Sequence, residues 1–166
     1  GLLTIIVPRH PARGDQIAAM LREDGLVVAQ RSHHEPVGDE TDIYLGDTLG
    51  EMGLFYSQSC IAFVGGSLVP VGGHNPLEPA RLNNAVLFGP HMHNFETPAS
   101  ALLQAGAAYQ VDGREALVAA LQDWLSAPQT AQIAAVHGKQ VTEQSVGVAA
   151  RVADDLLSLL PPVRET

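Results

Sequence analysis

Residues 61–88 read IAFVGGSLVPVGGHNPLEPARLNNAVLF, and this stretch contains a strand, a loop, a helix and a second strand. The apolar runs at 61–64 and 85–88 have the length of buried strands, and the segment from Pro76 to about Leu82 has helical spacing. A sheet covered on both faces uses continuous rather than alternating apolar strands. The pattern therefore predicts a β-α-β unit with parallel strands.

The same alternation continues on both sides of this unit. β-rich runs predict further strands at residues 2–7, 26–30, 43–45 and 108–111. Helical periodicity predicts further helices at residues 16–22, 48–57, 97–104, 115–126, 130–139 and 147–160. We expect residues 1–166 to form one α/β domain, a Rossmann-like doubly wound parallel sheet of about six strands.

Composition and charge exclude several classes of protein. The chain is 46% hydrophobic and 16% charged, which is ordinary for a packed domain and excludes disorder. A net charge of −9 opposes nucleic-acid binding, which needs a basic surface. No apolar run approaches the roughly 18–20 residues of a membrane-spanning helix, so we expect a soluble chain. It begins at Gly1 rather than Met, and we expect it to be part of a longer protein.

The first candidate site follows the first strand. Ligands of doubly wound sheets bind beyond the carboxyl ends of the strands. Arg9, His10 and Arg13 place positive charge there, near the N-terminus of a predicted helix, which also favours anions. These residues are either a turn with solvated arginines or an anion clamp, because a guanidinium group matches phosphate geometry. The residues alone leave both interpretations open.

The second candidate site follows the third strand. Thr48 and Glu51 have the spacing of a capping box, which would satisfy the first N–H groups of the next helix. Gly46 and Asp47 stand at the strand end, where their backbone could contact a ligand.

The third candidate site follows the strand at 61–64. Paired glycines, Gly65 and Gly66, let bare backbone approach an anion, and the Ser67 hydroxyl could add a donor. Ser67 does not lie in a G-x-S-x-G motif, which disfavours a hydrolase nucleophile. No G-x-G-x-x-G follows the first strand either, which disfavours a hydride-transferring enzyme.

The loop continues into the helix that begins near Pro76. Asn75 before Pro76 is typical of a helix N-cap, and Glu78 lies in the first helical turn. A carboxylate at that place could instead accept hydrogen bonds from a sugar diol. His74 is either a polar ligand contact or a turn residue. His91 and His93 follow the next strand, but no metal-binding motif accompanies them, and a loop lining a nucleotide or sugar site is the favoured interpretation.

These strand-end motifs occur together in one known family. In chain order they are PRHP at 8–11, GDTLGE at 46–51, VGGSL at 64–68, GGHNPLEP at 72–79 and GPHMHNF at 89–95. Their combination closely resembles the carboxyl-terminal half of 3-deoxy-D-manno-octulosonic acid (Kdo) transferases. Each motif alone is weak, but the shared order and spacing are specific. The resemblance covers nearly the whole chain.

The resemblance implies one half of a two-domain GT-B glycosyltransferase. This half would bind CMP, the nucleotide of the donor CMP-Kdo, and the amino-terminal half, absent from this sequence, would receive lipid A precursor. The absent half would also carry the membrane-associating surface and the general base. The parent protein would act in lipopolysaccharide biosynthesis at the cytoplasmic face of the bacterial inner membrane, and the isolated domain would be inactive.

The resemblance also implies roles for single residues. Arg9 matches the arginine expected at the CMP phosphate, and Glu78 matches the glutamate expected at the ribose hydroxyls. The turn at 65–67 matches the segment beside the phosphate. The candidate donor-binding residues are Arg9, His10, Gly46, Asp47, Gly65, Gly66, Ser67, His74, Asn75 and Glu78.

The family inverts the anomeric centre: an acceptor hydroxyl attacks as CMP leaves, and negative charge grows on the phosphate. Arg9 and the backbone of Gly66 and Ser67 would stabilise the leaving group, and one such preorganised donor is worth about 10²–10³ in rate. A monophosphate carries less charge than a diphosphate, so we expect neither a metal nor a cofactor. Two alternatives remain: a GT-B domain for a nucleoside diphosphate sugar, and a non-catalytic nucleotide-binding module.

Overall fold

The structure is a computed structural model that describes the backbone of residues 1–158 and the side chains of residues 1–144. Its contacts divide the chain into two compact units, the first from Gly1 to Gln58 and the second from Ser59 onward. Each unit contains one parallel sheet of three strands.

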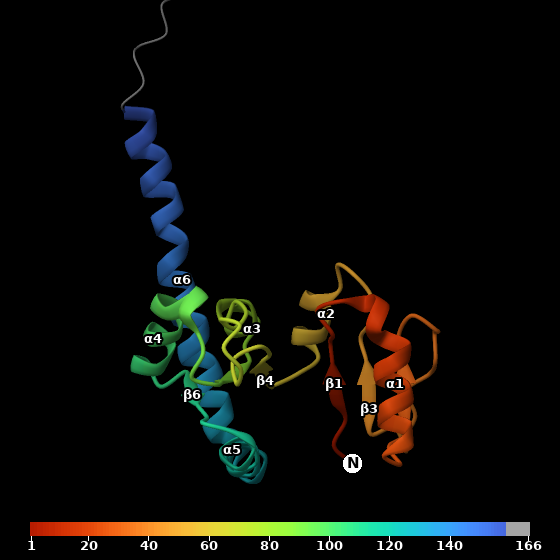
Figure 1. Cartoon of the computed structure of the whole chain (residues 1–166). Helices are drawn as coiled ribbons and strands as arrows, with labels where there is room; N and C mark the ends of the chain where they lie inside the picture. Colours follow the sequence, from red (N-terminus) through yellow and green to blue (C-terminus); the bar gives the residue numbers. More distant parts are fainter. Residues whose placement is uncertain (159–166) are drawn as a thin grey trace, which may run out of the picture. The chain divides into compact units, whose positions relative to one another are not determined.

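In the first unit, β1 (Thr4–Ile6), β2 (Val28–Gln30) and β3 (Ile43–Leu45) form a sheet in the order β1-β3-β2. Figure 1 shows α1 (Gly14–Glu23) lying along this sheet. Its buried Ala18 belongs to the apolar cluster that includes Leu45 of the central strand. The short elements η1 (Pro11–Arg13) and α2 (Met52–Ser57) complete the unit.

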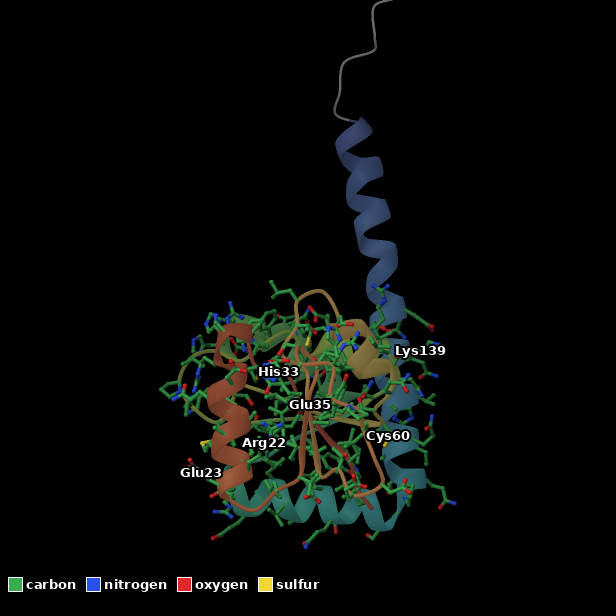
Figure 2. The ribbon with its side chains drawn as sticks, turned by 90° about the vertical axis from the view of Figure 1, so that its right-hand side faces the viewer. Arg22, Glu23, His33, Glu35, Cys60 and Lys139 are labelled. Carbon is green, nitrogen blue, oxygen red and sulfur yellow. The ribbon has the colours of Figure 1, made fainter. Side chains whose placement is uncertain are left out.

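An ion pair ties α1 to the loop after β2. Arg22 on α1 donates a hydrogen bond of 2.7 Å to Glu35 Oε2 and one of 3.0 Å to the carbonyl of Val28, and Figure 2 shows the two charged side chains. The same carboxylate oxygen accepts a hydrogen bond of 2.8 Å from the backbone N–H of Gln30. Both groups are partly exposed, so the pair contributes little by itself and mainly fixes the path of the loop.

In the second unit, β4 (Ile61–Val64), β5 (Ala85–Phe88) and β6 (Ala108–Gln110) are parallel in the order β4-β5-β6. The helices of the unit are α3 (Leu77–Arg81), η2 (His93–Phe95), α4 (Glu96–Gln104), α5 (Arg114–Ser126) and α6 (Pro128–Ser158).

The central strand β5 is buried on both faces. Phe88 packs on one side in a cluster with Ala80 of α3 and Leu102 of α4. Leu87 packs on the other side in a cluster with Trp124 of α5 and residues of α6. The double coverage explains why the strand is apolar at every position.

The Rossmann-like α/β fold class is confirmed, with the six strands grouped by hydrogen bonds into two sheets of three. The number of helices differs at the carboxyl-terminal end. The structure has a single helix, α6, in place of the two helices predicted at 130–139 and 147–160, of which residues 159 and 160 lie outside the described part. The polar segment between them is part of this helix. Within it, the hydroxyl of Thr142 donates a hydrogen bond of 2.7 Å to the carbonyl of Lys139. Within the described residues, no helix has the length and apolar character needed to cross a membrane.

Candidate functional site

The first unit gathers its predicted residues at one edge of its sheet. Ile6 of β1 pairs with Leu45 of β3, so both strands end together, and Arg9 and His10 follow the first while Gly46 and Asp47 follow the second. The N–H of Gly46 donates to the carbonyl of Ile6 at 2.8 Å. Arg9 and His10 are exposed.

Asp47 is buried, and its side chain is occupied inside the unit. Its Oδ1 accepts the Ser32 N–H at 2.9 Å, and its Oδ2 accepts the Ser32 hydroxyl and the Gln30 amide, both at 2.7 Å. Burial alone would raise the pKa of Asp47, but these hydrogen bonds outweigh it and lower the pKa below its ordinary value. The carboxylate therefore organises the loop after β2, and only the backbone could offer a ligand contact.

The expected capping box at Thr48 and Glu51 is wrong. Helix α2 begins at Met52, and no side chain caps it. Arg31 binds the Glu51 carboxylate through two N–H groups, at 2.7 and 3.1 Å, and the Thr48 hydroxyl donates to the same carboxylate. A bidentate guanidinium is a stronger partner for a carboxylate than a backbone amide, which explains the difference. These bonds lower the pKa of Glu51 to about 2.

In the second unit, Gly65 and Gly66 follow β4 directly. Gly66 has a φ of 69°, a conformation that glycine adopts at low cost. The imidazole of His74 lies beside this turn: an ideal Cβ on Gly66 would stand 3.7 Å from its Nε2 and 3.0 Å from a methyl carbon of Val71. The structure thus brings the predicted Gly65, Gly66 and His74 together.

The expectation that the Ser67 hydroxyl faces a ligand needs correction. Ser67 has no exposed surface, and its hydroxyl donates to the carbonyl of Val64 at 2.5 Å and accepts the N–H of Gly89 at 2.8 Å. Its one hydrogen is therefore already used within the unit. The backbone of the turn remains as the part that could meet an anion.

The loop after β5 supports the glycine loop. The N–H of Asn94 donates to the carbonyl of Gly72, and its side-chain amide donates to the carbonyl of Val71, both at 3.3 Å. An ideal Cβ on Gly72 would stand 2.1 Å from the amide nitrogen of Asn94. Gly73 lies equally close to Met92, where a Cβ would stand 2.3 Å from the sulfur. Both glycines are needed for the two loops to approach each other.

Asn75 makes the kind of hydrogen bond expected of a cap, because its Oδ1 accepts the N–H of Leu77 at 3.1 Å. The helix begins at Leu77, however, so Pro76 rather than Asn75 stands at the N-cap position. Its Nδ2 also donates to Glu78 Oε1, at a long 3.3 Å. Glu78 is exposed in the first turn of α3. Its carboxylate retains acceptor capacity for hydroxyl groups, since each oxygen can accept more than one hydrogen bond.

Several contacts were not identified from the sequence. The partners of Asp47 and Ser67 lie far along the chain, at Ser32 and Gly89, and no local pattern announces them. In the sequence, the glycine pair at 72 and 73 was the feature from which the close approach of the 89–95 loop could have been predicted. Among the side chains that the structure describes, no three His, Cys, Asp or Glu residues gather as a metal ion would require.

Comparisons with known proteins identify relatives of this chain. No protein-family model matches the chain. The 3-deoxy-D-manno-octulosonic acid transferase of Bordetella pertussis is 40% identical over 157 residues, which cover 93% of this chain and 36% of the relative. The enzyme of that name from Haemophilus influenzae is 36% identical over 165 residues, covering 99% of this chain and 38% of the relative. The chain thus spans a little more than a third of the length of these relatives.

A solved structure matches as well. The crystal structure of the C-terminal CMP-Kdo binding domain of WaaA from Acinetobacter baumannii aligns with a TM-score of 0.80 and 33% identity. The alignment covers 85% of this chain and 74% of that domain.

Parallel strands with glycine-bearing turns at their carboxyl ends define a Rossmann-like α/β domain of the kind that forms half of a GT-B glycosyltransferase. More particularly, the chain belongs to the family of 3-deoxy-D-manno-octulosonic acid (Kdo) transferases.

Proposed function

We propose that this chain is the donor-binding domain of a Kdo transferase and binds the CMP moiety of CMP-Kdo. The observation that carries the proposal is the match to the CMP-Kdo binding domain of WaaA, which extends over 74% of that domain. The candidate residues follow strands of the sheet in each of the two compact units.

Each candidate residue has a role in this proposal. In the first unit, Arg9 is the candidate cationic contact of the nucleotide phosphate. In the second unit, the backbone N–H groups of Gly65 and Gly66 are the candidate neutral donors to a phosphate. The exposed carboxylate of Glu78 accepts hydrogen bonds from the ribose hydroxyls. His74, beside the glycine turn, contacts the donor near its phosphate. His10, Gly46, Asp47 and Asn75 are the further donor-binding candidates, Asp47 by its backbone.

The reaction follows from the donor. An acceptor hydroxyl of lipid A precursor attacks the anomeric carbon of Kdo, the bond to the phosphate oxygen breaks, and CMP leaves. Groups that hold the phosphate gain strength as charge develops there. The general base, the acceptor site and the membrane contact belong to the remainder of the parent protein, at the cytoplasmic face of the inner membrane. No metal or cofactor takes part in this scheme.

Calorimetric titration of the chain with CMP, UDP and GDP in parallel tests the proposal. CMP should bind, and the other two nucleotides should bind at least tenfold more weakly, a difference of about 1.4 kcal/mol. Preference for UDP or GDP would favour a domain for a nucleoside diphosphate sugar. A full-length protein that binds CMP-Kdo but transfers no Kdo to lipid A precursor would favour the non-catalytic module.

A further inference from the structure

Two serine hydroxyls join the segments around β4 and β5, one at each end of this strand pair. At the amino end, Ser59 donates to Asn84 Oδ1 at 2.5 Å. At the carboxyl end, the hydroxyl of Ser67 accepts the N–H of Gly89 at 2.8 Å. Only the second bond lies next to the glycine turn proposed to meet the nucleotide phosphate.

Ser67 makes three hydrogen bonds within the second unit. Its hydroxyl donates to Val64 at the end of β4, the same hydroxyl accepts from Gly89, and its carbonyl accepts the N–H of His91 at 2.9 Å. The backbone contact is equally tight, because an ideal Cβ on Gly89 would stand 2.3 Å from the carbonyl oxygen of Ser67. The segment that follows Gly66 is thereby fixed to the end of the central strand.

The glycine turn itself needs such a fixed end. Two adjacent glycines have more conformational freedom than other residues, and that freedom is lost when their N–H groups are aligned on an anion. An anchor that orders the turn before the ligand arrives reduces this cost and increases affinity. The N–H of Gly73, which donates to the carbonyl of Gly66 at 3.1 Å, restrains the turn from its other side.

We propose that Ser67 is a positioning residue: its buried hydroxyl preorganises the Gly65–Gly66 turn for the phosphate of the nucleotide without touching the ligand. The inference rests on the proposed function, because it assigns the turn to the phosphate. It differs from that function in placing Ser67 behind the binding surface rather than in it.

The test compares Ser67→Ala with Ser59→Ala, a matched serine that makes its hydrogen bond at the opposite end of the same strand pair. Both variants should lower the melting temperature. In calorimetry, Ser67→Ala should weaken CMP binding by on the order of tenfold, the equivalent of about one hydrogen bond, and Ser59→Ala should leave it unchanged. In ¹⁵N relaxation, the amides of Gly65 and Gly66 should become more mobile in Ser67→Ala alone.

Each outcome bears on the proposal. Equal CMP affinity of Ser67→Ala and the wild type, or equal losses in both serine variants, would overturn the positioning role while leaving the proposed function intact. Failure of the wild type to bind CMP would overturn the proposed function and this inference with it. If Ser67→Ala does not fold, Ser67→Cys carries the same test, because its thiol keeps a similar volume but is a weak hydrogen-bonding group.

Discussion

The carboxylate of Asp47 lies directly against Gly14, the first residue of α1. An ideal Cβ on Gly14 would stand 2.1 Å from Asp47 Oδ2. The start of α1 therefore faces a buried carboxylate that is already hydrogen-bonded to Ser32 and Gln30. A negative charge is favourable at a helix N-terminus, so this contact stabilises the first unit.

Gly14→Ala should lower the free energy of unfolding by about 1–3 kcal/mol, because the added methyl group displaces the Asp47 carboxylate from its donors. Gly53→Ala is the matched control: Gly53 also lies in a helix, and a Cβ there meets nothing within 4 Å. Urea denaturation followed by circular dichroism measures both. Equal stability of the two variants would show that the Asp47 contact does not constrain the start of α1.

Acid should weaken the first unit through Glu51. Its pKa lies at about 2 in the folded chain, against an ordinary value of 4.5, mainly because of the hydrogen bonds from Arg31 and then Thr48. A lowered pKa stabilises the fold above pH 4.5, and this contribution is lost as the pH falls toward 2. Denaturation curves between pH 7 and pH 2 should show the loss, and Arg31→Met should show a smaller one. Parallel curves for the two proteins would contradict the role of this pair.

Gly72→Ala should disrupt the contact between the two loops of the second unit. Gly72 has a φ of 97°, and a Cβ there would also collide with Asn94. Gly50→Ala separates the two effects, since Gly50 has a φ of 81° but open space around it. We expect Gly50→Ala to cost about 1 kcal/mol and Gly72→Ala clearly more. Melting temperatures measure the stability lost in each variant. If Gly50→Ala lowered the melting temperature as much as Gly72→Ala, the collision with Asn94 would be relieved at no cost in stability.

Glu78→Gln should weaken the preference for a ribose. If its carboxylate accepts hydrogen bonds from both ribose hydroxyls, the wild type should bind CMP about tenfold or more tightly than 2′-deoxy-CMP, since a hydrogen bond to a charged group contributes about 1.5–3 kcal/mol. In Glu78→Gln this difference should shrink. Glu96→Gln serves as the control, because Glu96 is also an exposed residue in the first turn of a helix. An unchanged preference in Glu78→Gln would remove Glu78 from the ribose site.

The sequence predicts most of the fold because several strands of the two sheets are continuous apolar runs. The segments at 43–45, 61–64 and 85–88 are strands with the predicted boundaries. The strands predicted at 2–7, 26–30 and 108–111 are shorter in the structure, and the first and last of them are only partly buried.

The candidate site is predicted less completely because its contacts join residues distant in sequence. The hydrogen bond of Asn75 at the start of α3 was predictable from its neighbours alone, because its partner is only two residues away. Glu51 was misassigned because Arg31, twenty residues earlier, binds it. Ser67 was assigned to the ligand because Gly89, whose N–H donates to its hydroxyl, lies 22 residues further along the chain.

Calorimetry with CMP and cytidine shows whether Arg9 holds the nucleotide phosphate. The wild type should bind CMP more tightly than cytidine, because only CMP carries the phosphate. Arg9→Ala should weaken CMP binding by about tenfold or more and leave cytidine binding unchanged, since a charge-assisted hydrogen bond contributes about 1.5–3 kcal/mol. Unchanged CMP affinity in Arg9→Ala, or an equal loss for both ligands, would show that Arg9 does not hold the phosphate.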